Sequence, residues 1–91
     1  MEFRQLNTFV TVADLNSFTR AADILGYTQP TVTSQIQLLE SELGVRLFER
    51  IRKNISLTHD GEKLLVYARQ IVGLCEEAKN TVKDHPVPKG V

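Results

Sequence analysis

A short stretch of the chain, TQPTVTSQIQL at residues 28–38, combines hydroxyl and amide side chains with almost no charge. Its apolar members Val32 and Ile36 lie four residues apart, and the pattern continues to Leu39 and Leu43, as on one face of a helix. The opposite face carries hydroxyls and amides, which offer hydrogen-bond donors and acceptors. Such a face suits the reading of a hydrogen-bonding pattern on a partner.

Side chains that could catalyse a reaction or bind a metal are few and poorly placed. Ser56, His59 and Asp60 include the residue types of a catalytic triad, but neighbours at a strand–helix junction rarely converge in that way. The two histidines and the single cysteine, Cys75, are too widely spread for a zinc site, and no glycine-rich phosphate loop is present. We therefore expect no enzyme activity, no catalytic residue, no metal and no cofactor in this chain.

The composition is that of one small globular domain, or of one domain with an extension. The chain has 91 residues, of which 42% are hydrophobic and 24% charged. Its formal net charge of zero, taken alone, argues against a nucleic-acid partner. The charge is unevenly distributed, however, because residues 50–59 contain three basic side chains and no acidic one, whereas Glu76, Glu77 and Asp84 lie near the C-terminus.

Membrane insertion and secretion have no support in the sequence. No apolar run approaches the roughly 18 to 20 residues that a membrane span needs, and the N-terminal MEFRQL lacks the apolar core of a signal peptide. A single Cys75 allows no intrachain disulfide, which fits a reducing compartment. We expect a cytoplasmic protein without membrane contact.

Apolar spacing and capping residues predict two helices at the start of the chain. Helical spacing over residues 2–15 predicts the first. Ser17 is a good N-cap for the second, because its hydroxyl can accept a hydrogen bond from a free backbone N–H. Gly26 follows the last apolar residue of that helix, as a C-cap should.

A third helix is expected to contain the polar stretch described above. Thr28 can cap it, and Pro30 lies in its first turn, where a missing N–H does little harm. Gly44 follows its last apolar residue. Because the link before it is short, the second and third helices form a helix-turn-helix over about residues 18–37.

Two short strands joined by a turn are expected at residues 45–57 and are called the wing. The first strand opens at Leu47, and apolar and polar residues alternate in the second strand from Ile55. The turn is expected to contain Arg52, Lys53 and Asn54. Of these, asparagine best tolerates the left-handed conformation that a tight turn often needs.

A long helix is expected over residues 59–85, capped by Thr58. Apolar residues recur along it at alternating spacings of four and three, which is the heptad pattern of a coiled-coil seam. The first half of the seam could pack on the domain's own core, and the second half suggests a second copy of the chain. The alternatives are a seam that is entirely intrachain and a Cys75 that only packs. The seam, and thus the expected dimer interface, consists of Leu64, Ala68, Ile71, Cys75, Ala78 and Val82.

These elements, in this order and with these residues, closely resemble the N-terminal DNA-binding domain of LysR-type transcriptional regulators. The matching segments include FRQLNTF at 3–9, SF at 17–18, QPTV at 29–32 and LGVRLFER at 43–50. The match covers nearly the whole chain. It implies a mostly α-helical fold in which residues 1–58 form a winged helix-turn-helix of three helices and a two-stranded wing, followed by a long linker and dimerisation helix.

The resemblance also implies a bacterial-type regulator of transcription that binds double-stranded DNA as a homodimer on an interrupted inverted repeat. The recognition helix would lie in the major groove and the basic wing on the backbone or in the minor groove. Residues 86–91 resemble a hinge, so we expect a fragment whose missing C-terminal domain would bind a small-molecule effector. A tetramer of the full-length protein and contact with RNA polymerase are further expectations.

The expected DNA contacts lie at the starts of the second and third helices and in the wing. Hydroxyls and amides can pair with base edges, whereas basic side chains meet phosphates. Many relatives have arginine where this chain has Ser34, which removes a guanine reader. The expected contacts are Ser17, Phe18, Thr28, Gln29, Pro30, Thr31, Thr33, Ser34, Gln37, Arg50, Arg52 and Lys53.

Two other functions compete with DNA binding. A winged-helix module that binds protein and not DNA would keep its partner when Arg52 and Lys53 are changed to Glu. A small enzyme would lose turnover in a His59→Ala variant.

Overall fold

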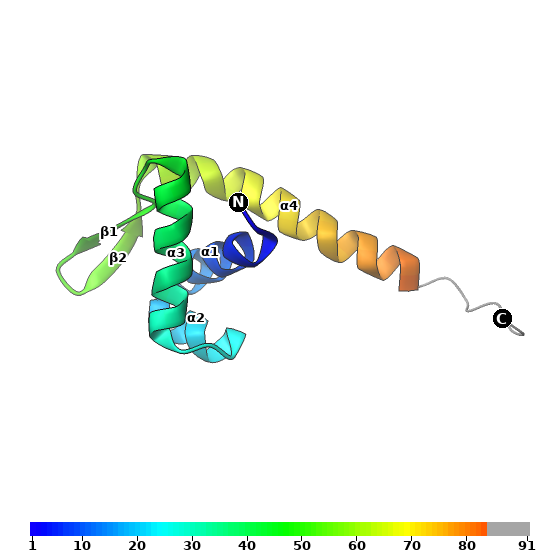
Figure 1. Cartoon of the computed structure of the whole chain (residues 1–91), viewed down its shortest axis with the longest axis horizontal. Coiled ribbons are helices and arrows are strands. Elements are labelled where there is room, and N and C mark those ends of the chain that lie inside the picture. The colour runs from blue at the N-terminus through cyan, green and yellow to red at the C-terminus, as the bar shows by residue number, and fades with distance from the viewer. Residues whose placement is uncertain (84–91) are drawn as a thin grey trace, which may run out of the picture.

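The computed structural model describes residues 1–83 of the chain (Figure 1). The elements in chain order are α1 (Phe3–Leu15), α2 (Phe18–Leu25), α3 (Gln29–Leu43), β1 (Phe48–Ile51), β2 (Asn54–Leu57) and α4 (His59–Lys83). The three short helices cluster together, the hairpin projects beside α3, and α4 extends away from the cluster (Figure 1). The predicted mostly helical, winged helix-turn-helix fold is confirmed. The predicted end of the long helix at residues 84–85 and the predicted hinge at 86–91 lie outside the described residues.

The predicted caps set the boundaries of the helix-turn-helix. The Ser17 hydroxyl accepts a hydrogen bond from the backbone N–H of Arg20 at 3.1 Å, and the Thr28 hydroxyl accepts one from the N–H of Thr31 at 3.3 Å. Gly26 ends α2 in the left-handed conformation that favours glycine. These caps make the polar stretch begin α3 at a defined point, directly after a short turn.

The core lies where the three short helices meet the start of the wing and the first half of α4. Its fully buried apolar side chains are Phe9, Val12, Ala21, Val32, Leu39, Leu47 and Ala68. The ring of Phe48, at the start of β1, packs 5.4 Å from the ring of Phe9 and 5.5 Å from that of Phe18, measured between centroids. Offset and edge-to-face aromatic pairs of this kind add to the stabilisation from burial. They fix the base of the wing against α1 and α2.

The wing is an antiparallel hairpin with a two-residue turn. Ile51 pairs with Asn54, so only Arg52 and Lys53 remain for the turn. Arg52 has a φ of 61°, and the prediction that Asn54 lies in the turn and supplies the left-handed residue is wrong. The register of the hairpin explains the difference: Asn54 pairs with Ile51 and so belongs to β2, and in a two-residue hairpin the residue with positive φ lies in the turn itself. Of the two turn residues, only the first, Arg52, has a positive φ, as in a type II′ turn. Glycine is the usual residue at that position of the turn.

The helix α4 changes its surroundings along its length. Ala68 is fully buried in the core, and Leu64 and Ile71 are half-buried against it. By contrast, 63% of Leu74 and 69% of Val82 is exposed. The expectation that Ala68 lies in a dimer interface is therefore wrong, because its own chain already covers it. The heptad pattern could not reveal this, since intrachain and interchain packing need the same apolar spacing.

Candidate nucleic-acid interface

One face of α3 is held inward and the other is open to solvent. Val32, Ile36 and Leu39 are buried, which fixes the rotation of the helix about its axis. Thr33 is half-buried at the edge of the open face. The open face is formed by the predicted contact residues Gln29, Pro30, Thr31, Ser34 and Gln37.

Hydrogen bonds at the start of α3 orient two of these side chains. The Thr19 hydroxyl of α2 donates to Oε1 of Gln29 at 3.3 Å. The Gln29 amide nitrogen has no bond of its own within residues 1–83, so it remains able to donate to a partner. The hydroxyls of Thr28 and Thr31 lie 2.9 Å apart and share a hydrogen bond. The Thr31 hydroxyl is thus already engaged, whereas Gln29 presents an oriented donor.

The wing presents three basic side chains. Arg50, Arg52 and Lys53 are exposed, and within residues 1–83 none of them forms an ion pair. The guanidinium of Arg50 lies 5.8 Å from the centroid of the Phe18 ring, which is within cation–π range. Arg50 is therefore directed back toward the start of α2, whereas Arg52 and Lys53 occupy the tip.

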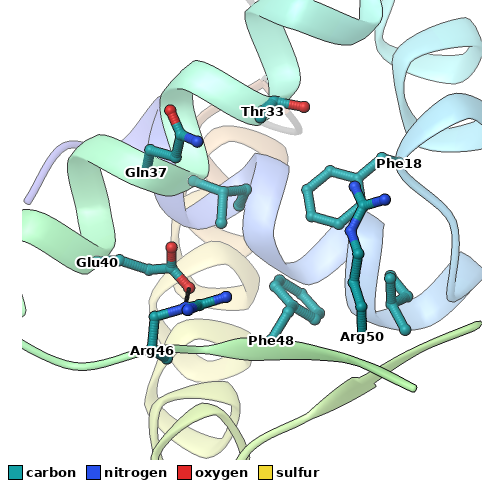
Figure 2. Close-up of a pocket in the computed structure, with 9 residues that line it drawn as sticks. Phe18, Thr33, Gln37, Glu40, Arg46, Phe48 and Arg50 are labelled. Atoms are coloured by element: carbon teal, nitrogen blue, oxygen red, sulfur yellow. Dashed lines mark ion pairs between the residues drawn. The ribbon is translucent and has the colours of Figure 1, made fainter. Parts of the chain in front are cut away.

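Two hollows gather the predicted residues from different elements. The first, of about 100 Å³, lies between α3 and the wing, and Figure 2 shows Phe18, Thr33, Gln37 and Arg50 around it. The second, of about 170 Å³, brings Ser17 and Gln29 together with Lys53. The remaining predicted contacts, which line neither hollow, are Thr28, Pro30, Thr31, Ser34 and Arg52. The starts of α2 and α3 and the wing thus form one continuous surface.

Sequence reasoning missed further residues of this surface, among them Thr19, Arg46 and Glu40, which lines the first hollow beside Arg46. Thr19 lies in the second hollow and bonds to Gln29. Arg46 lies at the end of the first hollow, with a side chain that is 78% exposed (Figure 2). Arg46 carried a signal in the sequence, because it is a basic residue directly before the buried Leu47. Thr19 carried none, since its bond depends on how α2 packs against α3.

Residues 1–83 contain neither a cluster of metal-ligating side chains nor a helix that could span a membrane. Among residues 1–83, no group of three or more His, Cys, Asp or Glu side chains is placed to hold a metal ion. None of the helices in this range combines the length and the apolar character needed to cross a membrane.

Comparison with known proteins addresses the family directly. The model of the family described as bacterial regulatory helix-turn-helix protein, lysR family, matches residues 3–62. The chain is 49% identical to an uncharacterized HTH-type transcriptional regulator, YwqM of Bacillus subtilis (strain 168), over 87% of this chain and 27% of that protein. It is 46% identical to the HTH-type transcriptional regulator CfxR of Cupriavidus necator, over 92% of this chain and 27% of that protein. The chain therefore spans about a quarter of the length of these two relatives.

Solved structures agree with this assignment. The chain superimposes on CbnR_DBD in its crystal structure with DNA, with a TM-score of 0.82, 41% identity and coverage of 91% of this chain and 95% of that one. It also superimposes on BenM_DBD in a complex with catB site 1 DNA, with a TM-score of 0.86, 38% identity and coverage of 91% and 93%. The curated relatives are regulators, in agreement with the expectation of a non-enzyme. The chain belongs to the lysR family of bacterial regulatory helix-turn-helix proteins, and its winged helix-turn-helix is the DNA-binding domain of a transcription regulator.

Proposed function

We propose that this domain binds double-stranded DNA sequence-specifically, as a homodimer on an interrupted inverted repeat, and thereby regulates transcription. The observation that carries the proposal is the continuous surface formed by the open face of α3 and the basic wing. A helix fits the major groove, and the adjoining wing then lies over the neighbouring backbone and minor groove.

In this arrangement α3 reads base edges. An oriented Gln29 amide can make a bidentate pair with adenine, and the hydroxyl of Ser34 can pair with several bases. The open face of α3 around Gln29 and Ser34 carries no basic side chain, which suits base reading more than phosphate binding. Ser34 in place of an arginine leaves the helix with less preference for guanine.

The wing and the helix starts would supply affinity. Arg52 and Lys53 at the tip would contact phosphates or the minor groove. Neither distinguishes the four base pairs as the major groove does, so these contacts would add affinity more than specificity. Arg50, whose guanidinium lies against the Phe18 ring, would contact the DNA backbone that separates the major groove from the minor groove. The backbone N–H groups near Ser17 and Thr28 can also bind phosphate oxygens.

The homodimer would form through the exposed part of α4. Tyr67 and Leu74 are 64% and 63% exposed and lie seven residues apart, so they share one side of the helix. Ala78 and Val82 are also exposed and continue this surface toward the end of the described helix. Leu64, Ile71 and Cys75 are half-buried and would lie at the edge of such an interface.

A longer protein that contains this domain would have further properties. Because the curated relatives are several times longer than this chain, we propose that such a protein binds a small-molecule effector outside this domain. It would form a tetramer, act in the cytoplasm and contact RNA polymerase at the promoter.

The decisive test is a binding titration on duplexes selected from random sequence. We expect an inverted repeat to emerge, with an affinity that falls log-linearly with salt as counterions are released. Binding that ignores both salt and sequence would contradict the proposal and favour the protein-interaction module.

The dimer is tested by Leu74→Glu, which would bury a charge without a partner. We expect the solution mass to fall from dimer to monomer. Asn80→Glu is the matched control, because it adds the same charge about 120° around the helix, at about 100° per residue. An unchanged mass for Leu74→Glu would show that this surface does not join two chains.

A further inference from the structure

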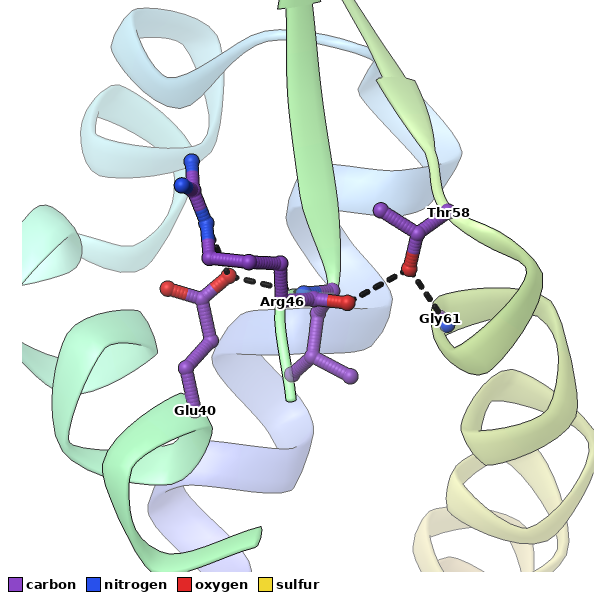
Figure 3. A network of polar contacts seen from close by, with 5 residues as sticks. Glu40, Arg46, Thr58 and Gly61 are labelled. Atoms are coloured by element: carbon purple, nitrogen blue, oxygen red, sulfur yellow. Dashed lines mark hydrogen bonds and ion pairs between the residues drawn. The ribbon is translucent and has the colours of Figure 1, made fainter. Parts of the chain in front are cut away.

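A single peptide group after α3, the one that joins Arg46 to Leu47, is held at both ends (Figure 3). Its N–H, on Leu47, donates to Oε2 of Glu40 at 2.8 Å. Its carbonyl oxygen, on Arg46, accepts the Thr58 hydroxyl at 2.5 Å. The same Thr58 hydroxyl accepts the backbone N–H of Gly61 at 2.9 Å. One peptide group is thus bonded to α3 on one side and to the start of α4 on the other.

The neighbourhood of this peptide group leaves little room for adjustment. Leu47 is fully buried, and its carbonyl oxygen accepts the N–H of Thr58 at 3.0 Å. A Cβ atom on Gly61 would lie only 2.2 Å from that carbonyl oxygen. The first turn of α4 therefore packs directly on the backbone that follows α3, and glycine is the residue that permits this approach.

Glu40 is the polar connection that α3 makes to this joint. The helix α4 packs mainly on α1, whereas α3 packs on both α1 and α2, so α3 and α4 have little direct contact with each other. Among the hydrogen bonds and ion pairs of residues 1–83, those of the Glu40 side chain join α3 to the start of the wing. That side chain is only 16% exposed, and its contact with Nε of Arg46 is longer, at 3.8 Å. The main interaction of Glu40 is therefore with the Leu47 N–H.

We propose that Glu40 is a positioning residue that sets the angle between α3 and α4, and thereby the distance between half-sites that the homodimer accepts. The inference rests on the proposed function, because it assumes that α4 joins two chains on an inverted repeat. The helix α3, with 15 residues, is about 22 Å long. A tilt of about 10° would move its far end by roughly 4 Å, comparable to the roughly 3.4 Å between base pairs. A fixed joint is thus needed to discriminate spacings that differ by one base pair.

Replacing Glu40 separates positioning from direct DNA contact. Glu40→Ala leaves the buried Leu47 N–H without a partner, so the backbone at the joint must shift to satisfy it. Glu40→Gln keeps a side-chain oxygen that accepts the same N–H and removes only the charge. Glu42→Ala is the matched control, because Glu42 is an exposed acid on the same helix that bonds to the N-terminal ammonium and not to the joint.

The experiment measures binding to the selected inverted repeat, to the same repeat with one base pair added between half-sites, and to an isolated half-site. We expect the parent chain, Glu40→Gln and Glu42→Ala to lose roughly tenfold in affinity on the lengthened repeat, since the protein or the DNA must be deformed. Glu40→Ala should lose much less of its affinity on that duplex. Its affinity for the isolated half-site and its salt dependence should equal those of Glu40→Gln, which removes the same negative charge beside Arg46.

Three results would overturn the inference. In the first, Glu40→Ala keeps the tenfold discrimination of the parent. In the second, Glu40→Gln loses discrimination as Glu40→Ala does, so that the charge and not the hydrogen bond matters. In the third, the parent binds no inverted repeat, which refutes the proposed function and the inference with it.

Thermal unfolding shows whether Glu40→Ala is folded, and Thr58→Ala provides an independent variant if it is not. Thr58→Ala releases the other end of the same peptide group, so it should give the same loss of spacing discrimination. Thr58→Ser keeps the hydroxyl and should behave as the parent. Equal discrimination in Thr58→Ala and Thr58→Ser would overturn the inference as well.

Discussion

The recognition helix α3 and the wing differ in how well the local sequence fits the backbone. The helix has a side-chain cap at Thr28, proline in its first turn and glycine at its end, all at positions that favour them. The wing has strands of only four residues, an Arg52 with a φ of 61° at its tip and an Ile51 that is 59% exposed. Local interactions thus fix the position of the helix α3, whereas the wing exposes Arg52 and Ile51 at a cost in local stability.

The largest expected effect comes from reversing the charge of the wing tip. The double variant Arg52→Glu, Lys53→Glu should lose on the order of 100-fold or more in affinity on every DNA sequence. Its salt slope on the inverted repeat should fall by about four, because two phosphate contacts are removed from each of the two protomers. Titrations at several salt concentrations measure both quantities.

The control for this variant reverses two charges elsewhere, with Lys79→Glu and Lys83→Glu near the end of α4. It should leave the salt slope almost unchanged. A loss in the wing variant that is confined to certain base sequences would contradict the assignment of the wing to the backbone.

A smaller effect, of about 1–3 kcal/mol, is expected for Gln29→Ala on a selected duplex. The reason is the loss of an oriented amide, so the preference should relax at one base-pair position while the salt slope stays the same. Binding to a panel of single-base variants of the duplex measures this. Gln70→Ala on α4 is the control, and a uniform loss across the panel for Gln29→Ala would assign that amide to the backbone instead.

The smallest effect concerns the conformation of the wing tip. Arg52→Gly should stabilise the fold by up to about 1 kcal/mol, because a positive φ costs an ordinary residue roughly 1–2 kcal/mol and the added freedom of glycine offsets part of the gain. The same variant should bind DNA more weakly. Lys53→Gly removes an equal charge without relieving a positive φ, so it should not be stabilised. Thermal unfolding of both variants therefore separates the effect of backbone strain from that of lost charge. Equal stability changes would show that Arg52 is not strained.

The sequence allowed most of α3 to be predicted, because its boundaries depend on local interactions. Thr28, Pro30 and Gly44 act within one turn of the helix end, and their effects are the same in most folds. The open face of α3 followed from the buried stripe at Val32 and Ile36, which a helical period alone places.

The sequence did not allow the wing turn to be predicted correctly, and it left open which residues of the α4 seam pack within their own chain. Whether Asn54 lies in the turn depends on which residues pair across the hairpin, and short strands leave that register weakly specified. Ala68 has the spacing of a seam residue, and only the packing of α4 on α1 shows that it is buried within its own chain. The bond from Thr19 to Gln29 likewise requires the relative placement of two helices.

The separation of charge described for the sequence affects how the molecule would meet DNA. The whole chain has no net charge, whereas the wing at residues 45–57 has four basic side chains and one acidic side chain, so the rest of the chain carries the compensating negative charge. Such a molecule gains little long-range attraction to a polyanion, but it has a dipole that would turn the wing toward the duplex at close range. Salt should therefore alter the lifetime of the complex more than the rate at which it forms.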